Sequence, residues 1–372
     1  MSKIVISGTG LYTPPESISN EELVECFNTW ATAFNTEHAE AIAAGRVEPK
    51  PLSNAEFIVK ASGIRSRHVL DKGGILDPEI MRPQLPTRSN DEPSQMCEMA
   101  VAAATQALEE AGRRPADVDA VLCAASNMQR SYPAVAVEVQ QYLGCGGYAY
   151  DMNVACASAA FGMQAAVDAL SSGNANCVLM VNPEICSGHL NFRDRDSHFI
   201  FGDACTAVVL ERAEDAKAGG FEVIGTRLKT QFSSNIRNNA GFLNRSEATP
   251  RSDEDRLFIQ EGRKVFKDVV PMVVALITEQ LADEGLEASA VRRFWLHQAN
   301  LNMNQLISKR LLGREPSEEE APVVLDEYAN TSSAGSVIAF HKHKSGLAPG
   351  DIAVLCAFGA GYSAGSVILR QR

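Results

Sequence analysis

The sequence predicts a layered α/β fold assembled from two similar halves. Apolar stretches with the length and composition of buried strands alternate with stretches whose apolar residues recur at helical spacing. Part of this pattern occurs twice, because residues 280–300 repeat the order of residues 107–127 at one constant offset, with Gly112 matching Gly285. The 372 residues also exceed a usual single core. Together these three observations favour a duplicated α/β unit with buried sheets.

The first predicted elements are a short strand and a helix. A glycine-containing turn follows the strand, but Pro14 prevents the helix that a dinucleotide-binding loop needs, so that interpretation is rejected. Asn20 is expected to cap the first helix. The apolar face of this helix carries Leu23, Phe27, Trp30 and Phe34, a stripe typical of core packing. Proline-containing surface loops are expected at residues 48–53 and 71–93.

Strands and helices then alternate toward the C-terminus. The pattern predicts a helix over residues 96–111, strands over 118–124, 147–154, 177–181 and 199–210, and a further strand from 291. Gly112 and Gly173 supply helix stops. After Glu211 the chain becomes rich in charged and small residues. We therefore place the boundary between the two halves in this stretch, with an N-terminal half of residues 1–217 and a C-terminal half of residues 218–372.

The composition sets the broad class of protein. Hydrophobic residues make up 45% of the chain and charged residues 22%, which is typical of a globular protein. The formal net charge of −12 disfavours non-specific nucleic-acid binding. No apolar run is long enough to span a bilayer, and a signal peptide is not expected. Nine cysteines without a Cys-x-x-Cys pair indicate free thiols, a cytoplasmic location and no zinc site.

One short stretch is distinguished by its chemistry. Cys156 lies where the predicted strand 147–154 turns into a helix, and its neighbours are too small to shield it. The N-terminus of a helix favours negative charge. We therefore expect this position to lower the pKa of the thiol and to make Cys156 a nucleophile. The alternative is a small buried cysteine at a tight packing point.

The second half supplies three further candidates. His297 ends an apolar strand, where ligands bind in α/β folds, and can act as an acid, a base or an oxyanion donor. A buried structural histidine is the alternative. Asn330 precedes a helix of small residues and could simply cap it. Residues 356–362 end a strand with a glycine loop, which can offer bare N–H groups to a ligand or be only a tight turn.

Taken together and in this order, the four stretches resemble the β-ketoacyl-ACP synthase III family of the thiolase superfamily. The resemblance extends over nearly the whole chain, from residue 4 to residue 369. It implies the duplicated thiolase fold, a five-layer αβαβα sandwich that forms homodimers, and so accounts for the internal repeat. It also implies an acyltransferase, a condensing enzyme of fatty acid biosynthesis that needs no metal or redox cofactor.

The resemblance further implies a decarboxylative Claisen condensation of an acyl-CoA primer with malonyl-ACP. Cys156 would carry the acyl group as a thioester. The backbone N–H groups of Cys156 and Ala360 would form the oxyanion hole, although the family more often has glycine at the latter position. His297 and Asn330 would stabilise the enolate that forms when carbon dioxide leaves.

Peripheral matches to the family are less complete. Arg195 is similar to the arginine beside the coenzyme A adenine, whereas Phe57 and Ala61 stand where the family has a tryptophan and an arginine. Tyr132 and Phe358 match the acyl channel, and Tyr132 matches a residue that reaches into the partner subunit. Basic positions that receive the carrier protein are matched by Lys267, Lys309 and Arg310, for which a solvated helix face is the alternative.

The segments 24–54 and 71–93 are longer than in short-chain enzymes of the family. This extra cover suggests a primer longer than acetyl, such as a medium-chain acyl-CoA. Three alternatives stay open: condensation of two acyl-CoAs, simple acyl transfer by the same superfamily, and a non-catalytic acyl-binding protein. Release of carbon dioxide from malonyl-ACP and the reactivity of Cys156 distinguish them.

Overall fold

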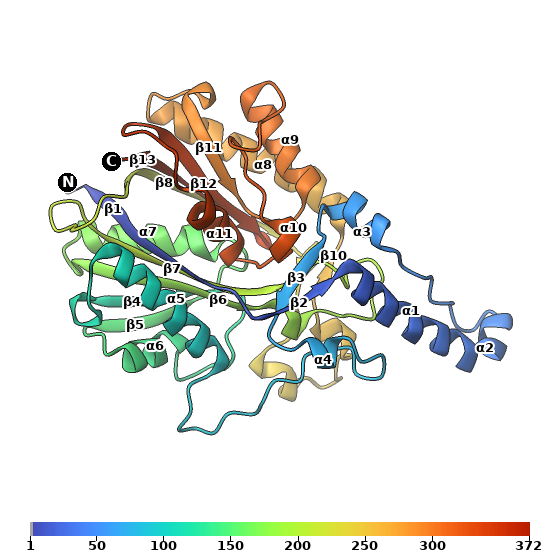
Figure 1. Cartoon of the computed structure of the whole chain (residues 1–372). Coiled ribbons are helices and arrows are strands. Elements are labelled where there is room, and N and C mark those ends of the chain that lie inside the picture. The colour runs from blue at the N-terminus through green and yellow to red at the C-terminus, as the bar shows by residue number, and fades with distance from the viewer. Residues whose placement is uncertain (1–2) are drawn as a thin grey trace.

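The structure is a computed structural model that describes residues 3–372. Its framework is a mixed sheet of nine strands in the order β11-β12-β13-β8-β1-β7-β6-β4-β5 (Figure 1). The pairs β4–β5, β4–β6 and β11–β12 are parallel, and the other neighbours are antiparallel. The predicted α/β fold is confirmed as an α/β fold with a mixed central sheet.

The strands of this sheet are β1 (Ile4–Tyr12), β4 (Ala120–Ala124), β5 (Tyr148–Met152), β6 (Cys177–Ile185), β7 (Asp203–Arg212), β8 (Phe221–Ser233), β11 (Val291–Leu296), β12 (Ile352–Gly359) and β13 (Gly361–Gln371). Two short ladders lie outside it: β2 (Glu16–Ser19) with β3 (Ser66–Val69), and β9 (Ile236–Arg237) with β10 (Ile259–Gln260). The helices are α1 (Asn20–Glu37), α2 (Ala39–Ala43), α3 (Ala55–Ser62), α4 (Lys72–Ile75), α5 (Gln95–Ala111), α6 (Val135–Leu143), α7 (Ser158–Ser171), α8 (Gly262–Asp283), α9 (Leu301–Leu312), α10 (Leu325–Tyr328) and α11 (Ala334–His343). Short 3-10 turns include Pro115–Asp117 and Ala288–Ala290.

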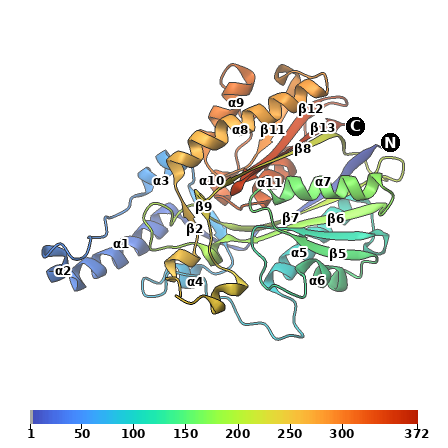
Figure 2. The same cartoon turned by 180° about the vertical axis from the view of Figure 1, so that it is seen from behind.

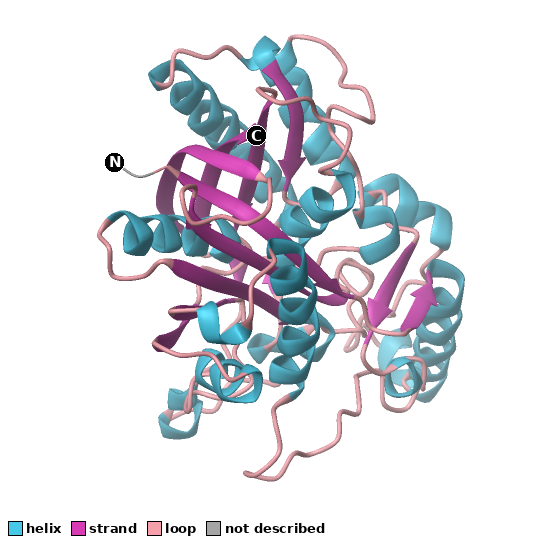
Figure 3. Cartoon of the chain, turned by 60° about the vertical axis from the view of Figure 1, so that its left-hand side comes forward, coloured by secondary structure: helices cyan, strands magenta, loops and turns pink. Residues whose placement is uncertain are grey.

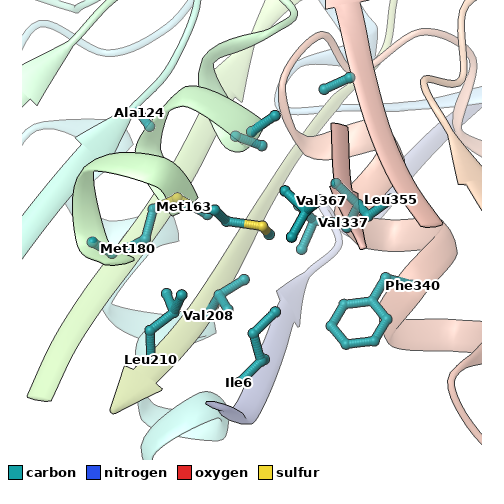
Figure 4. Packing of buried hydrophobic residues seen from close by; sticks show 14 of the residues in the cluster. Ile6, Ala124, Met163, Met180, Val208, Leu210, Val337, Phe340, Leu355 and Val367 are labelled. Atoms are coloured by element: carbon teal, nitrogen blue, oxygen red, sulfur yellow. The ribbon is translucent and has the colours of Figure 1, made fainter. Parts of the chain in front are cut away.

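The helices lie in layers around two wings of the sheet. Helices α5 and α6 cover one wing from outside, and α8 covers the other, with α9 beside it (Figures 2 and 3). Helices α7 and α11 lie between the wings and contact strands of both. The central core therefore joins Met163 of α7 and Phe340 of α11 to Ile6, Val208 and Leu355 of the strands (Figure 4).

The two wings meet where β1 pairs with β8. This joint consists of Ile4 opposite Val223, Val5 opposite Glu222 and Ile6 opposite Phe221. The sheet is therefore continuous across the boundary that the composition suggested after Glu211. The first half and the second half share one hydrogen-bonded framework, so elements of both can be positioned against each other rigidly.

The glycines near the start of the chain serve packing. A Cβ on Gly8 would lie 2.1 Å from the carbonyl oxygen of Ala107, and one on Gly10 would lie 1.9 Å from that of Ala103. Both carbonyls belong to α5, whose backbone therefore approaches β1 directly. This close approach of the two backbones explains why both positions are glycine, and no nucleotide-binding role is needed to account for them. It agrees with the rejection of a dinucleotide-binding loop.

The prediction that Asn20 caps α1 is wrong. Ser19 is the cap: its hydroxyl accepts a hydrogen bond from the Glu22 N–H, while the Glu22 carboxylate accepts one from the Ser19 N–H. Asn20 is buried instead, donates to the Ile64 carbonyl at 2.8 Å and accepts from the Arg67 guanidinium at 2.7 Å. A buried guanidinium requires acceptors, and this tertiary requirement cannot be read from a capping pattern.

Most predicted elements are confirmed within a few residues, including α5, β4, β5 and the start of β11. The longer segment 24–54 contains most of α1 and all of α2, which extend away from the body at the right of Figure 1. Within residues 3–372, no helix combines the length and apolarity needed to cross a membrane.

Candidate active site

Cys156 lies in a strained turn between β5 and α7. The preceding Ala155 has a φ of +48°, a left-handed conformation that costs a residue with a side chain about 1 kcal/mol. Local hydrogen bonds hold the turn. The Ala155 N–H donates to the Asn153 side chain, and the Ser158 hydroxyl accepts from the Val154 N–H while donating to the Ala155 carbonyl. The turn thus fixes Cys156 immediately before the helix.

A cavity of about 340 Å³ brings Cys156 of the first half together with His297 and Asn330 of the second. His297 follows β11, and Asn330 precedes α11. The remaining walls are mostly apolar and include Phe57, Phe199, Ile200, Phe258, Val265, Phe266, Val269, Met303 and Phe358. The three predicted catalytic residues therefore line one largely apolar cavity.

The Cys156 sulfur has three hydrogen-bond donors. The Ser332 hydroxyl donates to the sulfur at 3.3 Å, and the backbone N–H groups of Cys156 and Ala360 also point to it. Burial nevertheless raises the pKa of the Cys156 thiol to about 11, and these donors lower it only in part. The prediction of a lowered thiol pKa is therefore wrong for the resting protein, because desolvation outweighs the helix N-terminus.

Gly359 forms the floor beneath the sulfur. A Cβ at this position would lie 2.6 Å from the Cys156 Cβ and 3.0 Å from its sulfur. The predicted glycine loop is therefore the turn between β12 and β13, and it presents the Ala360 N–H toward Cys156. Both backbone donors expected for an oxyanion hole converge on the same atom.

His297 is buried and uncharged. Burial lowers the pKa of its imidazole to about 4. Its Nδ1 is buried and makes no hydrogen bond to any residue of the described chain. The ring lies edge-on to Phe358, with 5.3 Å between ring centroids. A neutral imidazole with an unused nitrogen on a reactive cavity differs from the satisfied structural histidine that was the alternative.

Asn330 does not cap α11, because Ser333 is the N-cap residue. The side-chain oxygen of Asn330 accepts from the Ser332 N–H at 2.9 Å, and this bond leaves the side-chain nitrogen of a residue that lines the cavity unused. The same turn places the Ser332 hydroxyl against the Cys156 sulfur, with a φ of +48° at Ser332. Asn330 and Ser332 are thus presented by one strained turn.

A buried carboxylate holds this turn and was missed by the sequence analysis. Glu184, at the end of β6, accepts hydrogen bonds from the Ser126 N–H and hydroxyl and from the Ser333 N–H and hydroxyl. Burial raises the pKa of Glu184. Ser333 is 149 residues away in the sequence, so no local pattern relates the two. Ser332 could have been noticed only as part of the Asn-Thr-Ser-Ser stretch.

At the mouth of the cavity, the expected coenzyme A contacts are only partly assembled. Phe57 lines the cavity, and the Arg195 guanidinium lies 4.6 Å from the centroid of its ring. Ala61 lines the same cavity and offers no charge. Arg263 of α8 also lines it, a cation that the sequence analysis did not single out.

Other predicted contact residues lie outside the cavity. Tyr132 is 85% exposed on the surface of its own chain, whereas Phe358 is buried in the cavity wall. Lys267 and Arg310 are exposed on the adjacent helices α8 and α9. Lys309, also on α9, forms an ion pair with Glu315. Across residues 3–372, no cluster of three or more His, Cys, Asp or Glu side chains could hold a metal ion.

Comparison with known proteins decides the family. The family models for 3-oxoacyl-[acyl-carrier-protein (ACP)] synthase III match residues 150–231 and, for its C-terminal part, residues 281–371. A protein of Pseudomonas aeruginosa, beta-ketodecanoyl-[acyl-carrier-protein] synthase, is 63% identical over 94% of this chain and all of its own. The chain belongs to the β-ketoacyl-ACP synthase III family. It is therefore an acyltransferase, a condensing enzyme of fatty acid biosynthesis.

More distant members of the family agree. Beta-ketoacyl-[acyl-carrier-protein] synthase III of Methylococcus capsulatus is 30% identical over 98% of both chains. The crystal structure of 3-oxoacyl-[acyl-carrier-protein] synthase III from Aquifex aeolicus VF5 superposes with a TM-score of 0.77 at 25% identity, covering 99% of both chains. The thiolase fold expected from the sequence is thus matched over the full length.

Proposed function

We propose that this β-ketoacyl-ACP synthase III condenses a medium-chain acyl-CoA with malonyl-ACP through an acyl-Cys156 intermediate. The observation that carries the proposal is the convergence of Cys156, His297 and Asn330 in one mostly apolar cavity. His297 is neutral and can accept a proton, whereas the Cys156 thiol is protonated at rest and must lose its proton in the first step.

In the first half-reaction, the Cys156 sulfur attacks the carbonyl carbon of the acyl-CoA thioester. The developing oxyanion takes the hydrogen bonds of the Cys156 and Ala360 N–H groups, and coenzyme A leaves as the thiol. Because the pKa of Cys156 is about 11, the thiol must lose its proton during the attack. Neutral His297 in the same cavity can accept that proton and pass it to the departing coenzyme A sulfur, and the Ser332 hydroxyl stabilises the Cys156 sulfur anion during the attack.

In the second half-reaction, the bond between the α-carbon and the carboxylate of malonyl-ACP breaks. Carbon dioxide leaves, and the electron pair forms an enolate whose oxygen accepts hydrogen bonds from His297 and Asn330. The enolate carbon attacks the acyl-Cys156 carbonyl, and the cysteine sulfur leaves as a thiolate that takes one proton from solvent to regenerate the resting thiol. The net products are β-ketoacyl-ACP, carbon dioxide and coenzyme A. The apolar wall excludes water from the acyl intermediate.

The primer is proposed to be octanoyl-CoA. The Pseudomonas aeruginosa relative is named for a β-ketodecanoyl product. Decarboxylative condensation adds two carbons, so a ten-carbon product requires an eight-carbon primer. The 63% identity and the longer segments 24–54 and 71–93 support the same preference here.

The remaining proposals concern organisation. Two repeats, residues 1–217 and 218–372, would form the five-layer αβαβα sandwich. Their correspondence is supported by two matching sequences of helix, 3-10 turn and strand: α5, Pro115–Asp117 and β4, then α8, Ala288–Ala290 and β11.

Two chains would associate as a homodimer through the edge strand β5, where Tyr148 and Tyr150 are exposed, with Tyr132 nearby in sequence.

Carrier-protein docking and location complete the proposal. Exposed Lys267, Lys309 and Arg310 on α8 and α9 would attract the acidic carrier protein and speed encounter. All nine cysteines are free, which suits the reducing cytoplasm. Neither mechanism step requires a cofactor.

The proposal is tested by supplying acyl-CoAs from acetyl to dodecanoyl with malonyl-ACP. Carbon dioxide release and the mass of the β-ketoacyl-ACP are measured for the wild type and for Cys156→Ser. We expect the fastest turnover with octanoyl-CoA and none with the variant. A clear preference for acetyl-CoA would reject the primer assignment. Products formed from two acyl-CoAs without malonyl-ACP would reject the carrier-dependent reaction.

A further inference from the structure

A buried carboxylate lies between the two halves of the active site. Glu184 is 1% exposed and stands near the end of β6. Its side chain accepts five hydrogen bonds, from the N–H and hydroxyl of Ser126, the N–H and hydroxyl of Ser333, and the thiol of Cys186. Burying a charge is costly unless hydrogen bonds compensate it. Within residues 3–372, no lysine, arginine or histidine forms an ion pair with Glu184, so these donors offset the cost.

On one side, Glu184 is bonded to the strand end next to the Cys156 turn. Ser126 follows β4, and its N–H and hydroxyl lie 2.9 Å and 2.6 Å from the two carboxylate oxygens. The neighbouring Ala125 carbonyl accepts a 3.4 Å hydrogen bond from Ser158, whose hydroxyl also holds the Cys156 turn. Glu184 is thereby connected to the part of the first half that presents the nucleophile.

On the other side, Glu184 fixes the peptide that follows Ser332. The Ser333 N–H donates to the carboxylate at 3.1 Å, and the Ser333 hydroxyl donates to the same oxygen. Ser332 itself has a φ of +48°. A residue with a side chain keeps such a conformation only where surrounding contacts enforce it. The two hydrogen bonds to Glu184 are contacts of this kind.

The conformation of Ser332 determines how the site is assembled. Its N–H donates to the Asn330 side-chain oxygen at 2.9 Å, and its hydroxyl lies 3.3 Å from the Cys156 sulfur. The Asn330 backbone is held separately, by two hydrogen bonds with residues 200–202. Loss of the Glu184 contacts would therefore leave the Asn330 backbone in place and free its side chain to rotate.

We propose that Glu184 is a positioning residue for the decarboxylation step, in which it aims the Asn330 amide at the enolate oxygen through the turn at residues 332–333. This inference rests on the proposed function, which assigns Asn330 to the enolate. The oxyanion hole does not depend on these contacts, because the Cys156 and Ala360 N–H groups belong to other turns. Glu184 should therefore matter far more for carbon dioxide release than for acylation of Cys156.

The test compares Glu184→Met with Glu184→Gln in two single-turnover measurements, acylation by octanoyl-CoA and carbon dioxide release from malonyl-ACP by the acylated enzyme. Methionine has a similar length but no acceptor oxygen. Because a displacement of about 1 Å can cost about 100-fold, Glu184→Met should lower carbon dioxide release about 10- to 100-fold and acylation less than about threefold.

Glutamine is the conservative replacement. Three of the five donors meet the same oxygen of Glu184, and the side-chain oxygen of glutamine can take its place. Since only the extra strength of a charged acceptor is lost, Glu184→Gln should stay within about threefold of the wild type at both steps.

A second measurement shows whether Glu184 acts through Asn330. In an Asn330→Ala background, Glu184→Met should change carbon dioxide release less than about twofold, because the side chain that it positions is absent. Ser333→Ala is a milder variant, since the Ser333 hydroxyl makes no helix-capping bond, and it should lower carbon dioxide release about three- to tenfold. Glu211→Gln is the matched control: Glu211 is a buried carboxylate that pairs with Arg113 outside the cavity, and both steps should be unchanged.

Equal losses of acylation and carbon dioxide release in Glu184→Met would overturn the positioning role. So would an unchanged carbon dioxide release, a loss in Glu184→Gln as large as in Glu184→Met, or the full loss recurring in the Asn330→Ala background. If circular dichroism shows that Glu184→Met does not fold, Ser333→Ala decides by the same two rates. A wild type that takes up no octanoyl group and releases no carbon dioxide would instead refute the proposed function.

Discussion

At the scale of single residues, the protonation state of Cys156 defines how the site must work. Its sulfur accepts a hydrogen bond from the Ser332 hydroxyl and has the Cys156 and Ala360 N–H groups directed at it, and it is still held as a neutral thiol because it is buried among mostly apolar side chains. A neutral thiol beside a neutral imidazole is a weak nucleophile. In the mechanism that we propose, attack therefore depends on a bound thioester that places its carbonyl carbon against the sulfur while the proton moves to His297.

The pH dependence of Cys156 alkylation reports the pKa of its thiol directly. With a pKa of about 11, the thiolate fraction grows about tenfold per pH unit through the neutral range, so the rate with iodoacetamide should rise steadily from pH 7 to pH 10. Peptide mass spectrometry distinguishes Cys156 from Cys145, the other cysteine that is not fully buried. A rate that levels off near pH 7 would show a lowered thiol pKa and contradict the structure.

The roles of His297 and Asn330 can be separated from that of Cys156. His297→Ala and Asn330→Ala remove enolate donors and should lower condensation by about 100- to 1000-fold each. Acyl-Cys156 should still form in Asn330→Ala, because the oxyanion donors on Cys156 and Ala360 are untouched. Intact-protein mass after octanoyl-CoA, followed by carbon dioxide release from malonyl-ACP, reports both steps. Full condensation by Asn330→Ala would exclude it from the site.

At the scale of elements, the start of α1 has two neighbouring side chains with different functions. Ser19 caps the helix, whereas Asn20 satisfies a buried guanidinium, that of Arg67. Burial lowers the pKa of Arg67 to about 9, because desolvation disfavours its charged form.

Substitutions at this helix start should therefore differ in cost. Ser19→Ala should lower the free energy of unfolding by about 1 kcal/mol through loss of the cap. Asn20→Ala should cost about 1.5–3 kcal/mol, because it removes an acceptor from a buried charge. Thr29→Ala, exposed on the same helix, serves as the control. Urea unfolding provides the three values, and an Asn20→Ala cost at or below that of Ser19→Ala would refute the assignment.

At the scale of the whole molecule, the sheet ends in an unprotected edge. Strand β5 is the last in the order, and the Tyr148 N–H points inward to the Asp119 carbonyl. Successive N–H groups alternate, so the Ala149 N–H faces the open edge. Such an edge with exposed tyrosines invites pairing with a second copy.

Proline at Ala149 tests the proposed dimer. Ala149→Pro removes an edge donor without touching the β4–β5 ladder, so it should convert a dimer to monomers while retaining the fold. Ala149→Thr keeps the N–H and should stay dimeric. Light scattering after gel filtration gives the mass, and circular dichroism checks the fold. An unchanged mass for Ala149→Pro, or a monomeric wild type, would place the interface elsewhere or remove it.

Local sequence determined the elements and the chemistry of the candidate site. Residue patterns located α5, β4 and β5, and the strand-to-helix corner identified Cys156, because these signals depend on residues close in the chain. Residue type and order also led to His297 and Asn330. Backbone donors were expected at Ala360 because a glycine loop was visible beside it.

Only the tertiary structure decided what depends on distant partners. The pKa of Cys156 is set by apolar walls from both halves, and the turn that carries Asn330 is held by Glu184, far away in the sequence. Asn20 does not cap α1 as predicted, because its side chain accepts a hydrogen bond from the buried Arg67 guanidinium. Desolvation and buried hydrogen bonds are properties of the packed chain, and no window of neighbouring residues contains them.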